Sequence, residues 1–174
     1  MLIRPATTDD AALLHEIAST TFPLACPPDT LAESIEAFIV ANLSVDAFAS
    51  YVADPDRDLF LGSIDATPSG YTMVVYGEPS DPDVAASVAQ RPTAELSKCY
   101  ALPQAHGSGL AAALVASSAG AARTRGAKSL WLGVNQQNVR ARRFYEKCGF
   151  SVVGTKKFLV GERYEDDFVY AQEL

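Results

Sequence analysis

The first third of the chain carries apolar residues at helical spacing. They recur every three or four positions in separate stretches, as they do along the buried face of an amphipathic helix. The apolar positions are Ala11, Leu14, Ile17, Ala18 and Phe22, then Leu31, Ile35, Phe38 and Ile39, then Val45, Phe48, Ala49 and Val52. Each stretch is therefore predicted to form a helix. Thr7 or Thr8, followed by the acids Asp9 and Asp10, is expected to begin the first helix, and Pro23 is expected to break it.

The pattern then changes from helical spacing to short, strand-like apolar runs. Residues 59–64 and 71–76 predict an antiparallel pair of strands, joined by a turn at residues 68–70. Residues 78–92 are rich in proline, serine and aspartate, which is typical of a mobile loop. Within that loop, residues 84–90 could form a helical turn.

Strand and helix signals alternate from residue 93 onwards. The order is strand, turn, helix, strand and helix, at residues 93–102, 103–108, 109–125, 129–134 and 137–147. Such a βαβα unit is expected to bring its two strands together in parallel. Gly149 is expected to end the last helix. Residues 150–160 and 164–174 predict two closing strands, and residues 2–4 predict a short first strand.

Length and composition narrow the class of protein. A chain of 174 residues suits one domain, so residues 1–174 are expected to form a single domain. A hydrophobic fraction of 48% with 20% charged residues is typical of a globular protein and argues against disordered or fibrous classes. The net charge of −7 argues against a nucleic-acid binder, because neutralising phosphates requires a basic face. An acidic surface instead tolerates cationic partners.

Neither the cysteines nor the histidines predict a metal site. Cys26, Cys99 and Cys148 are far apart and form no C-x-x-C pair, so neither a disulfide framework nor a zinc knuckle is expected. His15 and His106 are too few for a metal site built from histidines. The chain has no basic N-terminal flank before an apolar run and no stretch of about 18 apolar residues. A soluble, cytoplasmic protein without membrane contact is therefore expected.

The junction between the strand at residues 93–102 and the helix after it is the strongest candidate for a binding site. It contains Gly107-Ser108-Gly109, a turn whose glycines let a ligand approach the main chain closely. Successive free N–H groups and the positive end of the helix point to the same place, which suits an anion such as a diphosphate. The alternative is a purely structural turn between strand and helix.

The same glycines also fit the dinucleotide fingerprint G-x-G-x-x-A, ending at Ala112. That fold needs an acid about twenty residues further on, to hold a ribose. Ala127 and Lys128 stand there instead, and only about sixty residues follow, too few for the remaining strands. The dinucleotide interpretation is therefore disfavoured.

Two signatures in order resemble those of the GNAT superfamily of N-acetyltransferases. The first, R/Q-x-x-G-x-G/A, is aligned with residues 106–111, His106-Gly107-Ser108-Gly109-Leu110-Ala111, where His106 replaces the usual arginine or glutamine. The second, N-x-x-A-x-x-x-Y-x-x-x-G-F, matches residues 138–150, with Asn138, Ala141, Tyr145, Gly149 and Phe150 at its fixed positions. The resemblance implies an α/β fold with a mixed, mainly antiparallel sheet of six or seven strands, helices on both faces and a splay after the fourth strand.

The resemblance also implies acetyl-coenzyme A as cosubstrate, and no metal. The backbone amides of Gly107, Ser108, Gly109, Leu110 and Ala111 would then hold its pyrophosphate, and His106 would stand beside them. The main chain at Cys99 and Ala101 would pair with the pantetheine arm as an added strand does. Asn138 would hydrogen-bond the cosubstrate, and Tyr145 would lie near the sulfur. A helix-start asparagine and a core tyrosine are the alternative interpretations of these two residues.

Acetyl transfer to an amine requires two proton movements. An alkyl ammonium has a pKa of roughly 10.4, so neutralising it at pH 7 costs on the order of 4–5 kcal/mol. Glu95, on the strand that leads to the glycine turn, is the candidate base, directly or through a water, although it could also be a solvated strand residue. Tyr145 is the candidate acid for the departing thiolate. The basic residues Arg140, Arg142, Arg143 and Lys147 form either a solvated face or contacts to the 3′-phosphate.

The acceptor is expected to be a small-molecule amine. Residues 131–134 and 153–161, on either side of the second signature, resemble the polyamine branch of the superfamily, and the net charge of −7 suits a cationic acceptor. Acids that could bind ammonium groups are Asp54, Asp56, Asp58, Glu78, Asp81 and Asp83, although ordinary surface acids are the alternative. A lysine side chain, a peptide α-amine, an amino acid or an aminoglycoside also stays open as acceptor. So do a non-catalytic sensor of acyl-coenzyme A and a homodimeric assembly.

Overall fold

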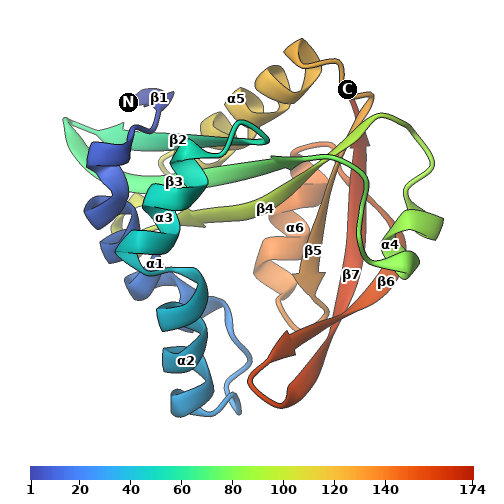
Figure 1. Cartoon of the computed structure of the whole chain (residues 1–174), viewed down its shortest axis with the longest axis horizontal. Coiled ribbons are helices and arrows are strands. Elements are labelled where there is room, and N and C mark those ends of the chain that lie inside the picture. The colour runs from blue at the N-terminus through green and yellow to red at the C-terminus, as the bar shows by residue number, and fades with distance from the viewer.

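A seven-stranded sheet runs through the computed structural model, which describes residues 1–174 (Figure 1). Its order is β1-β2-β3-β4-β5-β7-β6. The strands are β1 (Leu2–Pro5), β2 (Arg57–Ile64), β3 (Thr67–Tyr76), β4 (Thr93–Ala101), β5 (Ser129–Asn135), β6 (Ser151–Val160) and β7 (Arg163–Glu173). Only β4 and β5 pair in parallel, and all other neighbours are antiparallel. The mixed, mainly antiparallel sheet is confirmed.

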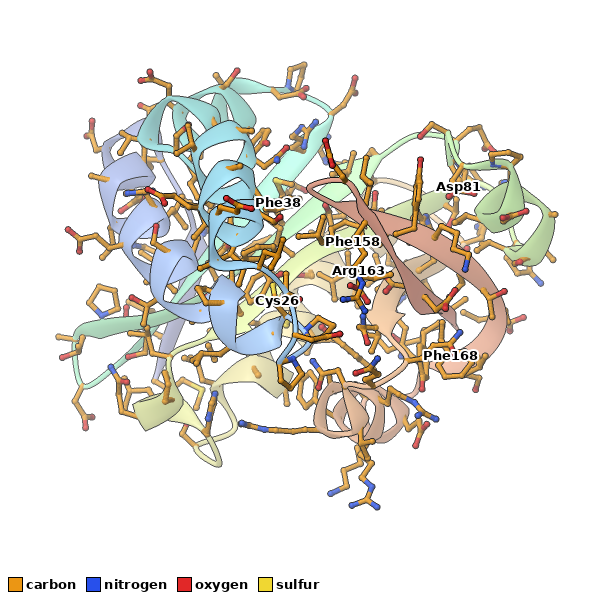
Figure 2. The ribbon with its side chains drawn as sticks, turned by 90° about the horizontal axis from the view of Figure 1, so that it is seen from below. Cys26, Phe38, Asp81, Phe158, Arg163 and Phe168 are labelled. Carbon is orange, nitrogen blue, oxygen red and sulfur yellow. The ribbon has the colours of Figure 1, made fainter.

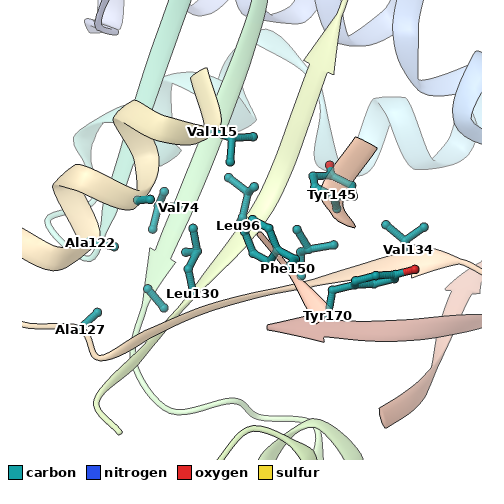
Figure 3. Close-up of a cluster of buried hydrophobic side chains, with 13 residues drawn as sticks. Val74, Leu96, Val115, Ala122, Ala127, Leu130, Val134, Tyr145, Phe150 and Tyr170 are labelled. Atoms are coloured by element: carbon teal, nitrogen blue, oxygen red, sulfur yellow. The ribbon is translucent and has the colours of Figure 1, made fainter. Parts of the chain in front are cut away.

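Helices cover both faces of this sheet. They are α1 (Ala11–Ala25), α2 (Ala32–Asn42), α3 (Val45–Ala53), α4 (Pro82–Ser87), α5 (Leu110–Thr124) and α6 (Val139–Lys147), with short 3-10 turns at Thr8–Asp10 and Pro103–Ala105. On one face α1 and α3 pack against β2 and β3 through a cluster that includes Leu14, Phe48 and Tyr71. On the other face α5 and α6 pack against β4, β5 and β7, through the cluster drawn in Figure 3. The sheet is thus the middle layer of the molecule.

Strands β4 and β5 separate soon after they meet. Their pairing covers only Thr93 to Glu95 against Ser129 to Trp131, and β4 has a bulge beside the Met73–Val74 step of β3. Beyond that point β4 keeps β3 as its partner, and β5 keeps β7. The separation leaves one edge of each strand without a strand partner. The predicted splay beside β4 is confirmed.

The start of the first helix follows the sequence signals, whereas its end does not. Thr7 and Asp10 form a capping box, and Arg4 donates two hydrogen bonds to the Asp10 carboxylate, at 2.7 and 2.8 Å. Helix α1 runs through Pro23 to Ala25, so the break expected at Pro23 is wrong. A proline in the last turn removes a single helical hydrogen bond, which a helix tolerates far better at its end than in its middle.

The hairpin between β2 and β3 turns earlier than predicted. Its two turn residues are Asp65 and Ala66, both with positive φ, of 48° and 65°. Residues 68–70, the predicted turn, belong to β3 instead. Gly70 is needed there because a Cβ atom would lie 2.8 Å from the carbonyl oxygen of Tyr100 on β4. A glycine is thus required at this position by the close packing of β3 against β4, and not by a turn.

Later elements agree with the prediction, and the helical turn left open at residues 84–90 is present as α4, which begins two residues earlier and ends at Ser87. No single helix is long and apolar enough to cross a membrane, although α2 and α3 together, bent by 41° at their junction, pass that test by length and composition.

Candidate active site

A cleft of about 260 Å³ opens where β4 and β5 separate. It is lined by residues of β4, β5, β6, β7 and α6 and by the ends of α1 and α2. Phe38 of α2 packs against Phe158 of β6, with ring centroids 5.8 Å apart, and Arg163 of β7 pairs with Asp29 at 2.8 Å. Figure 2 shows Phe38, Phe158, Cys26 and Arg163 at this junction. The hairpin of β6 and β7 therefore closes the cleft against the segment between α1 and α2.

The glycine turn lies at the N-terminus of α5, at the end of β4. Gly107 and Gly109 have positive φ, of 81° and 87°, which favours glycine. The N–H groups of Gly107, Gly109, Ala111 and Ala112 make no hydrogen bond within the chain. The N–H groups of Ser108 and Leu110 are already hydrogen-bonded. Ser108 donates to the Ala105 carbonyl oxygen, and Leu110 donates to the Ser108 hydroxyl. The turn thus offers four free donors beside the positive end of a helix.

The backbone favours a register of the first signature two residues earlier than the alignment at His106. Read as Gln104-x-x-Gly107-x-Gly109, the signature starts with its usual glutamine, and both glycine positions coincide with positive φ. His106 is then an ordinary intervening residue. Its Nε2 donates to the carbonyl oxygen of Ala101 at 3.2 Å, which ties the turn to the end of β4. The sequence analysis missed Gln104, although the spacing was visible.

Strand β4 supplies one wall of the cleft. Cys99 lines it, and from Leu96 to Ala101 the edge toward β5 has no strand partner. An extended ligand arm can add to such an edge. Ala101 differs from Cys99, because its carbonyl oxygen already accepts the His106 bond.

Tyr145 reaches the cleft from α6 and is 8% exposed. Its ring packs edge-on against Phe144 and Phe150, with centroids 5.1 and 5.8 Å away. Burial, with the Cys99 thiol beside it, raises the pKa of Tyr145 well above its usual value. The phenol therefore carries its proton at neutral pH and can donate it.

Asn138 caps α6, since its side chain accepts a hydrogen bond from the Ala141 N–H at 3.0 Å. The helix-start interpretation is thus correct as far as the side-chain oxygen is concerned. The Nδ2 group has no partner within the chain, and Asn138 lines the cleft. Both interpretations of this residue are compatible.

Three carboxylates line the cleft, and the sequence analysis singled out only one of them. Burial raises the pKa of Glu95, against the opposing charges of Lys156, Lys98 and Arg57. Glu165 and Asp167 on β7 are only 5% and 6% exposed. Burial raises the pKa of Asp167 to about 6, although Lys156 opposes the shift.

Glu165 and Asp167 could have been found from the strand period. Residues 165, 167 and 169 of β7 share one face, and that face is buried. Acids at the inward positions of a strand are rare unless they have a function or a partner. The pattern of residues 164–174 predicted the strand, but the face that its acids occupy was not predicted.

The acids around the β2–β3 hairpin are mostly engaged elsewhere. Asp54 pairs with Arg57 at 2.8 Å, and Asp58 accepts from both Arg125 and the Tyr76 hydroxyl. Asp81 caps α4. Glu78 pairs with Arg91 and, like Asp81, borders a second hollow that shares Glu95 with the cleft. The main cleft takes its acidic character from β4 and β7 instead.

Of the basic residues on α6, Arg142 is engaged with the protein. It donates to the Gln136 carbonyl oxygen at 3.1 Å and lies over the Phe168 ring at 4.8 Å. Arg140, Arg143 and Lys147 are exposed. No three His, Cys, Asp or Glu side chains gather closely enough to hold a metal ion, and all three cysteines are free.

The comparisons with known proteins agree with this geometry. Residues 13–150 match the acetyltransferase (GNAT) family. An uncharacterized N-acetyltransferase of Mycobacterium tuberculosis is 45% identical over 165 residues, covering 95% of this chain and 98% of its relative. A protein of Mycobacterium bovis described in the same words gives the same values.

Solved structures share the fold at lower identity. The PaiA N-acetyltransferase of Thermoplasma acidophilum, in complex with coenzyme A, superposes with a TM-score of 0.78 at 20% identity, covering 99% of this chain and 98% of that one. The ribosomal-protein-alanine N-acetyltransferase of Brucella melitensis gives a TM-score of 0.67 at 23% identity, with 100% of both chains covered. The family match over most of the chain, with mycobacterial relatives along nearly its whole length, shows that this protein belongs to the GNAT family of acetyltransferases.

Proposed function

We propose that this protein transfers an acetyl group from acetyl-coenzyme A to a primary amine of a small molecule, by direct attack in a ternary complex. The observation that carries the proposal is the set of four free N–H donors at the start of α5, next to a cleft that holds a protonated tyrosine and buried carboxylates. The free N–H donors thus follow the end of β4, and the acid–base groups line the cleft along the same strand. The complex of the Thermoplasma relative with coenzyme A supports the choice of donor.

The amides of Gly107, Gly109 and Ala111 would hold the pyrophosphate, with Ala112 as a fourth donor. Space in front of the glycines supports this role, since a Cβ atom would meet nothing within 4 Å at Gly107 and only Cε of Met1, at 3.9 Å, at Gly109. The unpartnered edge of β4 around Cys99 would pair with the pantetheine arm. Asn138 would donate from Nδ2 to the same arm.

The reaction joins the amine nitrogen to the acetyl carbon and breaks the carbon–sulfur bond. The thiolate that leaves needs a proton, which Tyr145 would supply from its buried hydroxyl. The amine must lose its own proton before it attacks, at a cost of about 4–5 kcal/mol at pH 7. A carboxylate on the cleft wall, either the sequence-predicted Glu95 or one of the two on β7, would receive that proton directly or through a water.

A small acceptor fits the cleft best, because its volume is about 260 Å³. Polyamines are the first candidates to assay, given the resemblance of residues 131–134 and 153–161 to the polyamine branch and the net charge of −7. Amino acids, peptides and aminoglycosides complete the panel.

The first experiment is a thiol-release screen of this panel with acetyl-coenzyme A. Release with at least one amine is the expected result, and no release with any of them would contradict the proposal. A thermal-shift titration tests the cosubstrate site separately. Acetyl-coenzyme A should raise the melting temperature of the wild type, and Gly109→Val should abolish that shift.

Gly126→Val is the matched control for Gly109→Val. Gly126 has the same φ of 87°, and a Cβ atom there would meet nothing within 4 Å, much as one at Gly109 would meet only Met1 at 3.9 Å. Gly126 lies beyond the other end of α5. Both variants should lose stability from backbone strain, while only the Gly126 variant keeps the ligand-induced shift. A shift preserved in Gly109→Val would place the ligand elsewhere.

A further inference from the structure

We propose that Asp167 of β7 is the carboxylate that contacts the ammonium group of the acceptor and takes its proton. The inference rests on the proposed acetyl transfer and assigns a residue that neither signature contains. Glu95 would then act from further away, as a second carboxylate of the cleft.

Asp167 lines the cleft from β7, which is paired with β5 on one side and β6 on the other. In the sheet it stands opposite Asn135 of β5 and Lys156 of β6. Its side chain lies over Gly133, because a Cβ atom at that position would lie 3.1 Å from Oδ2 of Asp167. A glycine in β5 is therefore what leaves room for this carboxyl group.

The carboxyl group has no committed partner. Its Oδ1 is buried and accepts no hydrogen bond, which is costly for a carboxylate. Lys156 is near enough to favour the charged form but forms no ion pair with it within 4 Å. In each of the seven ion pairs of the protein, the nitrogen and the carboxylate oxygen are at most 3.1 Å apart. An incoming ammonium group would supply the missing partner.

The neighbouring acids of β7 have cationic partners. Glu165, on the same face, lies 3.1 Å from Nε of Arg163, although its Oε1 accepts no hydrogen bond. Asp166 points the other way, is exposed and pairs with Lys157. Asp167 is thus the cleft-lining acid of β7 without an ion pair.

Asp167 and Tyr145, the proposed acid, both line the cleft. Glu95 lines the cleft too, but it also borders the neighbouring hollow with Glu78 and Asp81. Asp167 borders the cleft and not that hollow.

The proton and electron movements balance with Asp167 in this role. The ammonium group binds as its counterion and passes one proton to the carboxylate, which becomes neutral. The free nitrogen pair then forms the bond to the acetyl carbon, the carbon–sulfur bond breaks, and Tyr145 protonates the thiolate. The excess proton left on the amide nitrogen restores the Tyr145 hydroxyl, directly or through a water, and Asp167 returns its own proton to the solvent.

The test compares Asp167→Asn with Asp166→Asn, which removes a carboxyl group from the next residue on the exposed side. With an amine that turns over in the wild type, Asp167→Asn should lower kcat/KM about 10²–10⁴-fold at pH 7, the usual range for a positioned base. The loss should shrink toward pH 9.5, as more amine arrives already neutral. Asp166→Asn should stay within about twofold of the wild type at each pH.

A thermal shift with acetyl-coenzyme A shows whether each variant is folded and still binds the cosubstrate. A folded Asp167→Asn protein that keeps the activity and the pH profile of the wild type would overturn the inference. So would a large, pH-dependent loss in Glu95→Gln alone, which would assign the contact to Glu95. Absence of turnover in the wild type with every amine would overturn the proposed function itself, and this inference with it.

Discussion

Replacing Asp167 with asparagine is expected to make the folded protein more stable at neutral pH. Burial raises the pKa of this carboxyl group from its ordinary 3.8 to about 6. A difference of about two pKa units corresponds to about 3 kcal/mol that the folded state loses when the group ionises. An amide has the same shape and never ionises, so the variant avoids most of that cost. Because the amide also needs hydrogen bonds, the expected gain is about 1–3 kcal/mol.

The sign of the pH dependence follows from the direction of the shift. A raised pKa in the folded state means that the wild type carries no penalty below about pH 4, where the carboxyl group is protonated in both states. The penalty grows between about pH 4 and pH 6 and is complete above that range. The difference between variant and wild type should therefore be largest at pH 7.5 and fall below about 1 kcal/mol at pH 4.0.

Urea unfolding of the wild type and of Asp167→Asn at these two pH values measures the effect, provided that the m-values agree. Asp166→Asn, on the exposed side of the same strand, should change stability by less than about 0.5 kcal/mol at either pH. A loss of stability in Asp167→Asn at pH 7.5 would refute the reasoning. It would mean that the ionised carboxylate, through its attraction to Lys156, stabilises the folded state instead of destabilising it.

Three further predictions concern other parts of the chain. Tyr145→Phe keeps the ring packing, so acetyl-coenzyme A should still raise the melting temperature of the variant. Its turnover in steady-state assays should fall about 10²–10⁴-fold, because the proton donor is lost. Near-normal turnover without a pre-steady-state burst would contradict the assignment of Tyr145 as the acid. Asp10→Ala removes the capping box and should cost about 0.5–2 kcal/mol in urea unfolding. Since hydrogen bonding to Arg4 lowers the pKa of Asp10, that cost should be complete above about pH 4 and disappear as the pH falls further; a pH-independent cost would contradict it. Gly133→Ala places a Cβ atom 2.6 Å from the mobile Lys156 side chain and 3.1 Å from Asp167, so KM for the amine should rise several-fold with little change in melting temperature; an unchanged KM would argue against an acceptor at Asp167.

Local signals in the sequence were enough to predict many of the secondary-structure elements and turns of this protein. Helical periodicity identified α1, α2 and α3, because each turns one apolar stripe toward the core, although the stripe of α2 is only partly buried. The capping box at Thr7 depends on residues three positions apart and so is also a local property. The glycines of the turn before α5 were identifiable for the same reason, since a positive φ is a demand on one residue at a time.

Features that depend on distant parts of the chain could not be predicted in this way. Gly70 looked like a turn residue, and only the approach of Tyr100 from β4 shows why it is a glycine. Pro23 looked like a helix stop, although its position in the last turn lets α1 continue to Ala25.

The acidic side of the candidate site belongs to this second class. The pattern of β7 contains Glu165 and Asp167, but a strand has two faces, and its sequence does not say which one meets a cleft. That choice depends on β5 lying beside β7, on the separation of β5 from β4, and on Gly133 leaving space for a carboxyl group. The sequence by itself determined the helices, the glycine turn before α5 and the family signatures, because each arises within a short stretch of chain. The tertiary structure decided which carboxylates face the cleft, because that depends on how strands distant in sequence pack together.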